Sequence, residues 1–267
     1  MRAQGFLALH HGDGPLLIPN PWDVGSARVL ASVGFRALAT TSSGFAATLG
    51  RLDGSVTRDE ALAHAAAIVE ATELPVSADL EHCFAEDTAG VGETVSLAIE
   101  TGLAGCSLED STGRPDTPIF ELAEAAERVA AAAEAAHGGP VHLVLTARSE
   151  NYLHGRPHLG DTIARLQAFE DAGADVLYAP GLVDLGEIRT VVTSVGLPLN
   201  VLARPGAPSV AELASVGVRR ISVGGAFAFA ALGALVEAAE ELMTAGTYGY
   251  STRAAVGGKA AREAFRS

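Results

Sequence analysis

The chain contains few cysteines, and it has neither a leader-like N-terminus nor an uninterrupted apolar run. Cys83 and Cys106 are its only cysteines among 267 residues, too few for a disulfide framework, so a reducing cytoplasm is the expected compartment. The stretch from Met1 to Gly14 lacks the apolar segment of a signal peptide. The most apolar later stretch, Ile221 to Val236, contains three glycines and is shorter than the roughly 20 residues of a membrane span. We therefore expect a cytoplasmic protein with no membrane partner.

Positive charge is also scarce. There are 18 Lys and Arg against 32 Asp and Glu, which gives a formal charge of -14. A surface of that sign repels phosphate backbones, so a nucleic-acid partner is excluded. Small anionic ligands are not excluded, because a local arginine or a metal ion can dominate the potential inside a cleft. With 48% hydrophobic residues the composition is that of a globular protein.

What the sequence does contain is a regular alternation of short apolar runs and longer helical patterns. Eight strands are predicted at residues 16–20, 37–42, 75–80, 105–110, 141–148, 175–180, 198–203 and 220–224. Eight helices are predicted at residues 22–33, 58–72, 90–101, 120–136, 162–172, 185–195, 210–215 and 227–244. Helix starts are marked by Thr57 with Glu60, by Asp161, and by Ser209 with Glu212.

Eight strand–helix pairs at a spacing of roughly 30 residues predict a (β/α)₈ TIM barrel, formed by residues 1–267 as a single domain. The strand runs are apolar without alternation, as parallel strands buried on both faces are. A doubly wound sheet is the alternative. It is disfavoured because no Gly-x-Gly-x-x-Gly turn follows the first strands.

Carboxylates follow two neighbouring strands of the expected barrel. The third strand ends in Asp79 and Glu81, and the fourth in Glu109 and Asp110. The carboxyl ends of barrel strands form the active-site face, and several carboxylates there repel one another unless a cation lies between them. Hard oxygen ligands suit Mg²⁺, or Mn²⁺, better than Zn²⁺. Asp79 and Glu109 therefore predict a metal site, whereas Asp110 fits equally a metal ligand and a residue that caps the next helix or faces solvent.

Other polar residues follow the remaining strands. A guanidinium at Arg148 can hold a substrate carboxylate, form an internal salt bridge with Glu109 or Glu150, or do both. The turn Ser43-Gly44-Phe45 presents a hydroxyl and backbone N–H groups that can bind an oxyanion. The pair Gly224-Gly225 permits either a phosphate cradle or close helix packing.

The general acid is left open between several groups. His82 and Cys83 follow the third strand, and Tyr178 ends the sixth. A metal-bound water is a further possibility. The remaining histidines for which the sequence suggests no partner are His10, His11, His64, His137 and His142.

Several short motifs occur in one order between about Pro19 and Leu242. They are Asn20-Pro21-Trp22-Asp23, Ser43-Gly44, Leu49-Gly50 with Asp53, Pro75-Val76-Ser77-Ala78-Asp79-Leu80-Glu81, Ser107-Leu108-Glu109-Asp110 and Thr146-Ala147-Arg148. Together they resemble the isocitrate lyase / phosphoenolpyruvate mutase superfamily, in the branch similar to phosphonomutases and 2-methylisocitrate lyase. Each motif is short, but the ordered set is specific.

The resemblance implies a (β/α)₈ barrel, often with a C-terminal helix exchanged between subunits of a homodimer or homotetramer. Residues 247–267 would form that helical extension. The resemblance also implies that Mg²⁺ binds a small anionic keto acid and stabilises a pyruvate-type enolate. By motif, the metal is held by Asp79, Glu81 and Glu109; the keto acid by Trp22, Ser43, Gly44, Phe45, Arg148 and Asn200; and Arg148, Asp53 and His82 are the expected catalytic residues.

The sequence departs from the superfamily in the loop after the fourth strand. Residues 111–116 read Ser-Thr-Gly-Arg-Pro-Asp and lack the cysteine motif of isocitrate and methylisocitrate lyases and the lysine of the mutases. The expected function is therefore another C–C lyase acting on a small 2-oxo or hydroxy di- or tricarboxylic acid. The alternatives are a P–C bond enzyme of the phosphonopyruvate type, an oxaloacetate decarboxylase or hydrolase, and a keto-acid-binding barrel without turnover.

Overall fold

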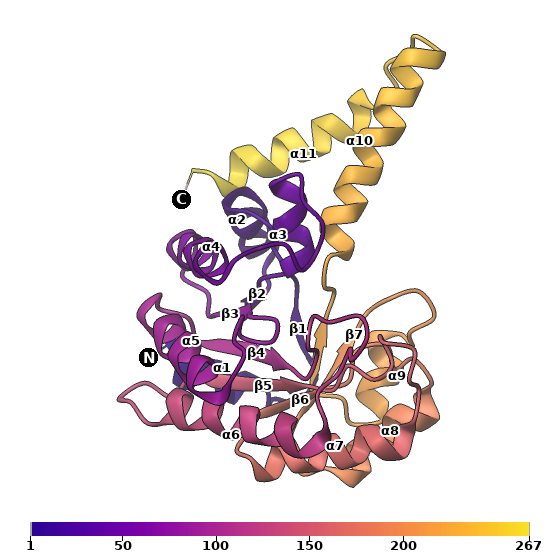
Figure 1. The fold of residues 1–267 in the computed structure, drawn as a ribbon. Coiled ribbons are helices and arrows are strands. Elements are labelled where there is room, and N and C mark those ends of the chain that lie inside the picture. Colours follow the sequence, from indigo (N-terminus) through magenta and orange to yellow (C-terminus); the bar gives the residue numbers. More distant parts are fainter. Residues whose placement is uncertain (1, 267) are drawn as a thin grey trace.

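The computed structural model describes residues 2–266 and consists of eight parallel strands in a nearly closed barrel surrounded by helices (Figure 1). The strands are β1 (Leu16–Ile18), β2 (Leu38–Ala39), β3 (Val76–Asp79), β4 (Gly105–Glu109), β5 (Val144–Arg148), β6 (Val176–Tyr178), β7 (Leu199–Leu202) and β8 (Arg220–Ser222). They pair in the order β1-β8-β7-β6-β5-β4-β3-β2. A hydrogen bond of 3.0 Å from Ala39 N–H to Pro19 O links the two end strands. This arrangement confirms the barrel and excludes the doubly wound sheet.

Each strand lies within its predicted range, and eight of the helices coincide with the predicted ones to within a few residues. These helices are α2 (Val24–Val33), α4 (Arg58–Glu70), α5 (Thr88–Glu100), α6 (Leu122–His137), α7 (Leu159–Asp171), α8 (Leu185–Ser194), α9 (Val210–Ser215) and α10 (Ala226–Thr244). The capping boxes of Thr57 with Glu60 and of Ser209 with Glu212 are confirmed. The cap predicted at Asp161 is wrong, because α7 begins earlier and His158 caps it.

Helix α1 (Arg2–Leu9) was not predicted, and it closes the amino-terminal end of the barrel. Phe6 is fully buried in an apolar cluster with Leu16, Val144 and Val176 from the first residues of three strands. The opposite end, where the strands finish, remains the open end of the barrel.

Helix α3 (Ser42–Thr48) corrects the prediction of a turn at Ser43-Gly44-Phe45. The Thr41 side chain caps this helix by accepting a hydrogen bond from Gly44 N–H. A Cβ on Gly44 would come within 2.6 Å of Thr41 Cγ2, so only glycine fits there. The first helical turn therefore begins close to the carboxyl end of β2, and its Ser42 N–H donates to Asp79 Oδ2 at 3.3 Å.

The chain ends in two helices that extend from the barrel (Figure 1). Helix α10 projects outward, and α11 (Ser251–Ala264) returns to pack against α2. One helix was expected within residues 247–267, where α11 lies; the status of this segment as an extension, its exchange between subunits and the treatment of the whole chain as one domain stay predictions. No helix within residues 2–266 is at once long and apolar enough to cross a membrane.

Candidate active site

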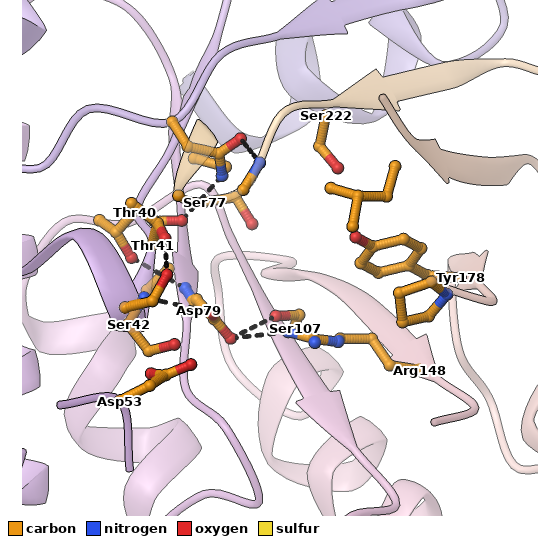
Figure 2. A pocket seen from close by; sticks show the side chains of 18 of the residues that line it. Thr40, Thr41, Ser42, Asp53, Ser77, Asp79, Ser107, Arg148, Tyr178 and Ser222 are labelled. Atoms are coloured by element: carbon orange, nitrogen blue, oxygen red, sulfur yellow. Dashed lines mark hydrogen bonds and ion pairs between the residues drawn. The ribbon is translucent and has the colours of Figure 1, made fainter. Parts of the chain in front are cut away.

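A cavity of about 170 Å³ opens at the carboxyl ends of the strands (Figure 2). Of the residues predicted for the site, Ser43, Asp53, Asp79 and Arg148 line it. Its other lining residues include Asn20, Thr40, Thr41, Ser42, Ser77, Ser107, Tyr178, Arg220, Ser222, Gly224 and Gly225. The volume suits a small organic acid and is far below that of a typical drug-sized site.

Arg148 lies at the centre of a cluster of carboxylates. Its Nη1 is 2.9 Å from Asp79 Oδ1, its Nη2 is 3.0 Å from Glu109 Oε2, and its Nε is 2.8 Å from Glu150 Oε1. Strand register explains the contact between Glu109 and Arg148, because these two residues are aligned across β4 and β5. The expected internal salt bridges are confirmed, and Asp79 joins them from β3. All three nitrogens of this guanidinium are therefore occupied by acids of the chain itself.

Two carboxyls near Arg148, those of Glu81 and Glu109, have raised pKa values. Burial, with repulsion from Asp79 and Asp53, raises the pKa of Glu81 to about 8, against a smaller opposite effect of Arg148. Burial also raises the pKa of Glu109, while contact with Arg148 lowers it. Burial alone would lower the pKa of Arg148. Its three carboxylate partners have the larger opposite effect and hold the pKa of the guanidinium well above its ordinary value. The site therefore contains more carboxyl groups than its one central guanidinium balances.

Glu81→Gln is expected to increase the free energy of unfolding in EDTA progressively from pH 5 to pH 9. With a folded pKa of about 8 against 4.5 unfolded, the stability contributed by the protonated Glu81 is complete below pH 4.5. The wild type loses that stability as the pH rises through 8 and Glu81 ionises. The glutamine variant does not ionise, so its free energy of unfolding does not fall in the same way. The gain at pH 9 should be on the order of 2 kcal/mol after solvent screening, measured by urea unfolding.

A matched control for this pH dependence is Glu70→Gln, which alters an exposed carboxylate at the end of α4. Its effect on unfolding should be the same at pH 5 and pH 9. If Glu81→Gln likewise gave a pH-independent difference, a raised pKa at Glu81 would be refuted.

The carboxylates around Arg148 fit a magnesium ion chemically, and of the three predicted ligands Asp79 lines this cavity whereas Glu81 and Glu109 do not. Asp79 and Glu109 contact the same guanidinium, and Glu81, which lines a small neighbouring cavity with Asp79, lies close enough to it for mutual repulsion. Mg²⁺ accepts carboxylate oxygens and retains several waters, so one or two direct protein ligands suffice. A divalent cation would also relieve the repulsion that raises the pKa of Glu81.

The loop after β3 is strained and holds Glu81 at the site. Glu81, Cys83 and Phe84 have φ values of 50°, 60° and 53°, in the left-handed region that costs non-glycine residues about 1 kcal/mol or more each. The fully buried Arg128 of α6 spans this loop from below, with Nη2 donating to His82 O at 2.9 Å and to Ala85 O at 2.8 Å. The surrounding structure therefore imposes the loop conformation that its sequence disfavours.

Two of the candidate acids in this loop lie away from the cavity. Cys83 is fully buried in the hydrophobic core, and burial raises the pKa of its thiol to about 12. The His82 ring faces the loop at Gly113, and burial followed by repulsion from Arg128 lowers its pKa. Neither side chain lines the cavity.

Three other predicted binding residues are placed beside the cavity. Trp22 packs against Gly44, and its carbonyl oxygen is 3.1 Å from Nε2 of His64. Phe45 stacks on the His64 ring with 3.9 Å between centroids. Asn200 is buried and donates to Ser222 Oγ at 3.0 Å, so it reaches the cavity through that hydroxyl.

Of two further cavity residues, Tyr178 was one of the candidate acids and Arg220 was not predicted. Tyr178 lies between Ser222 and Arg148 (Figure 2), and burial raises the pKa of its hydroxyl to about 12 despite opposing effects of Arg148 and the Ser222 hydrogen bond. Arg220 of β8 reaches the cavity from below. The sequence could have indicated the position of Arg220. In a strand of Arg220, Ile221 and Ser222 the first and third side chains point to the same face.

A second polar cluster lies at the opposite end of the barrel. His137 and His142 were expected without partners, but their Nε2 atoms lie 3.0 and 2.9 Å from the two carboxylate oxygens of Asp175. Within the described residues, this is the group of three whose ligand atoms lie within 4.8 Å of one another. The two rings are stacked with 4.0 Å between their centroids, and both Nε2 atoms are directed to the same carboxylate.

Comparison with known proteins gives consistent matches over most of the chain. The family model described as phosphoenolpyruvate phosphomutase matches residues 6–243. The 2-methylisocitrate lyase of Escherichia coli K12 is 28% identical over 204 residues, covering 73% of this chain and 68% of that protein. The oxaloacetate decarboxylase of Pseudomonas entomophila L48 is 28% identical over 222 residues, covering 79% and 74%.

Solved structures show the same similarity. A Burkholderia cenocepacia J2315 protein, provisionally described as a lyase/mutase, has a TM-score of 0.92 and 53% identity, covering 94% of this chain and 91% of its own. A 2,3-dimethylmalate lyase has a TM-score of 0.83 and 30% identity, covering 93% and 89%. A phosphonopyruvate hydrolase crystallised with oxalate and Mg²⁺ shares the fold at a TM-score of 0.82, with 23% identity and coverage of 92% and 88%.

Proposed function

The chain belongs to the phosphoenolpyruvate phosphomutase family of the isocitrate lyase / phosphoenolpyruvate mutase superfamily, and from that premise we propose that it is a Mg²⁺-dependent carbon–carbon lyase. Its proposed substrate is a small 2-oxo or hydroxy di- or tricarboxylic acid that is cleaved through a pyruvate-type enolate. One observation carries the proposal: Asp79 and Glu109, from neighbouring strands, contact Arg148 at distances of 2.9 and 3.0 Å, and Asp79 and Arg148 line the cavity.

The proposed roles follow from the positions of the side chains. Asp79, Glu81 and Glu109 would hold the Mg²⁺, or Mn²⁺, which supplies Lewis-acid stabilisation of negative charge on the substrate. Arg148 then faces the same anionic oxygens from the β5 side. Asp53 lines the cavity and adds to the charge around Glu81, which keeps it a candidate for proton transfer near the metal.

The proton that returns to carbon is assigned here to Tyr178. Its hydroxyl lines the cavity, whereas His82 and Cys83 do not. A pKa of about 12 keeps this hydroxyl protonated at neutral pH, so that it can donate a proton. Tyr178→Phe is the direct test, since it removes the hydroxyl while keeping the ring over Arg148.

Decarboxylation of a 2-oxo dicarboxylate is a second candidate, favoured by the same cavity. Its described lining contains Asp, Arg and Tyr but no His or Cys, and loss of CO₂ needs no strong protein acid. The relative in Pseudomonas entomophila carries this activity in its name.

The test is incubation with oxaloacetate, 2-methylisocitrate and phosphonopyruvate in Mg²⁺, with pyruvate followed by a coupled assay. Turnover of a C–C substrate that is lost in Asp79→Ala and Arg148→Ala supports the lyase. Turnover of phosphonopyruvate alone would assign the P–C branch instead. Tight oxalate binding without turnover of any of the three would indicate a binding protein and contradict the lyase.

We further propose a homodimer or homotetramer that uses the outer face of α10. Phe229, Leu235 and Val236 on this helix are 51–64% exposed, an unusual apolar density for a surface helix. Sedimentation equilibrium at micromolar concentration measures the assembly, and a monomer there would contradict it.

A further inference from the structure

The barrel interior directly beneath the active-site carboxylates is polar. Bulky branched residues usually fill these layers of a TIM barrel. Here Ser77, Ser107 and Ser222 line the lower part of the cavity, together with Arg220. Small hydroxyl side chains leave space in the centre, and the long side chain of Arg220 extends into it.

Strand register places Arg220 in the same row as the active site. Across successive strand pairs, Glu109 is aligned with Arg148, Arg148 with Tyr178, Tyr178 with Asn200, and Asn200 with Arg220. Register partners in a parallel sheet direct their side chains to the same face, so Arg220 faces the interior as Arg148 does. The next partner in the row is the apolar Leu16 of β1, so Arg220 is the last polar residue of this row that lines the cavity.

The charge of Arg220 is uncompensated. Its side chain is buried, with only 4% exposed, Nη1 donates to Thr146 Oγ1 at 2.9 Å, and Nε has no hydrogen-bond partner. Around it lie the ring of Phe6, 6.0 Å away, the Tyr178 hydroxyl, His10 and the like charge of Arg148. Among residues 2–266 no carboxylate pairs with it, whereas Arg148 contacts three.

We propose that Arg220 is a specificity residue that binds the second carboxylate of the substrate, the one distant from the metal-binding end. The assignment rests on the proposed function for the placement of the 2-oxo or hydroxy acid end near Asp79 and Glu109. Burying a guanidinium without a counterion costs free energy of desolvation. A substrate carboxylate that pairs with this guanidinium offsets that cost and forms charge-assisted hydrogen bonds. Ser77 and Ser222 line the same part of the cavity and can donate to the same anion.

The test compares two stable ligands that differ by one carboxylate. Lactate and malate share a 2-hydroxy acid end, and malate adds a carboxylate on the next carbon. Their affinities are measured by calorimetry in saturating Mg²⁺ for the wild type and for Arg220→Gln. The wild type should prefer malate by about tenfold to a hundredfold, the range expected for a hydrogen-bonded charge pair, and the variant should lose this preference while lactate affinity changes by less than about twofold.

Two further variants keep the assignment testable. Arg220→Lys retains the charge and should keep part of the preference. The matched control is Arg165→Gln, which removes an equally buried arginine whose charge is compensated by Asp110 at 3.0 Å outside the cavity. It should lower the melting temperature and leave the malate-to-lactate ratio unchanged, whereas Arg220→Gln should leave the unliganded melting temperature equal or higher.

A wild type that binds malate and lactate equally, or an Arg220→Gln variant that keeps the preference, would overturn the assignment and leave the lyase proposal untouched. A preference that depends on Arg220 in a protein without turnover on the substrate panel would count against the lyase proposal and support the role of Arg220. A lower melting temperature for unliganded Arg220→Gln, combined with an unchanged ratio, would show a structural role instead.

Discussion

Asp79→Asn should reduce kcat/KM by about 10³-fold or more on whichever substrate of the panel the wild type turns over. Asp79 accepts from Arg148 at 2.9 Å and from Ser42 N–H at 3.3 Å, so it links β3, the start of α3 and the central guanidinium. The substitution keeps the side-chain shape and one acceptor oxygen but removes the charge that would hold Mg²⁺. Steady-state kinetics across a Mg²⁺ titration measures the loss, which raised Mg²⁺ should restore only partly.

Loss of activity in this variant should not reflect loss of the fold. Asparagine removes one of several mutually repelling carboxylates, so the melting temperature in EDTA should stay within a few degrees of the wild type. Asp59→Asn is the matched control, since that carboxylate is 86% exposed at the start of α4 and should leave kcat/KM unchanged. Turnover of Asp79→Asn within tenfold of the wild type would remove Asp79 from the metal site.

The fold could be predicted from the sequence because its signals are local and repeated. Buried apolar strands, capping residues such as Thr57, and the spacing of the units each depend on near neighbours along the chain. Helix α3 escaped prediction because Ser43 and Gly44 favour a turn, and the Thr41 cap together with close packing against Trp22 overrides that preference. Helix α1 escaped prediction because it is held by a contact distant in sequence, the insertion of Phe6 into the barrel.

The candidate site could be predicted in part, because residues at the carboxyl ends of neighbouring strands must meet. That argument correctly brought Asp79, Glu109 and Arg148 together. It could not tell which loop residues turn inward, and His82 and Cys83 face away because the loop after β3 follows a left-handed path. That path depends on Arg128, which comes from a helix more than 40 residues later in the chain.

Arg128→Met should lower the free energy of unfolding by about 3–5 kcal/mol. The guanidinium donates to three carbonyl oxygens of the loop after β3, those of His82, Ala85 and Glu86, at 2.9, 2.8 and 3.4 Å. Methionine fills a similar volume but donates nothing, so these oxygens lose their partner and the left-handed residues lose the contact that holds them. Urea unfolding at neutral pH measures the change in stability.

The same substitution should weaken Mg²⁺ binding, because the loop that Arg128 holds carries Glu81. Arg219→Gln is the matched control. Arg219, like Arg128, donates to backbone, but it contacts one carbonyl, Gly12 O at 3.0 Å, and it lies at the exposed surface. It should cost less than about 1 kcal/mol and leave Mg²⁺ affinity unchanged. If Arg128→Met unfolded at the same urea concentration as the wild type, the strained loop would be held by its own residues, and Thr94, which donates to Cys83 O at 2.9 Å, would be the next contact to remove.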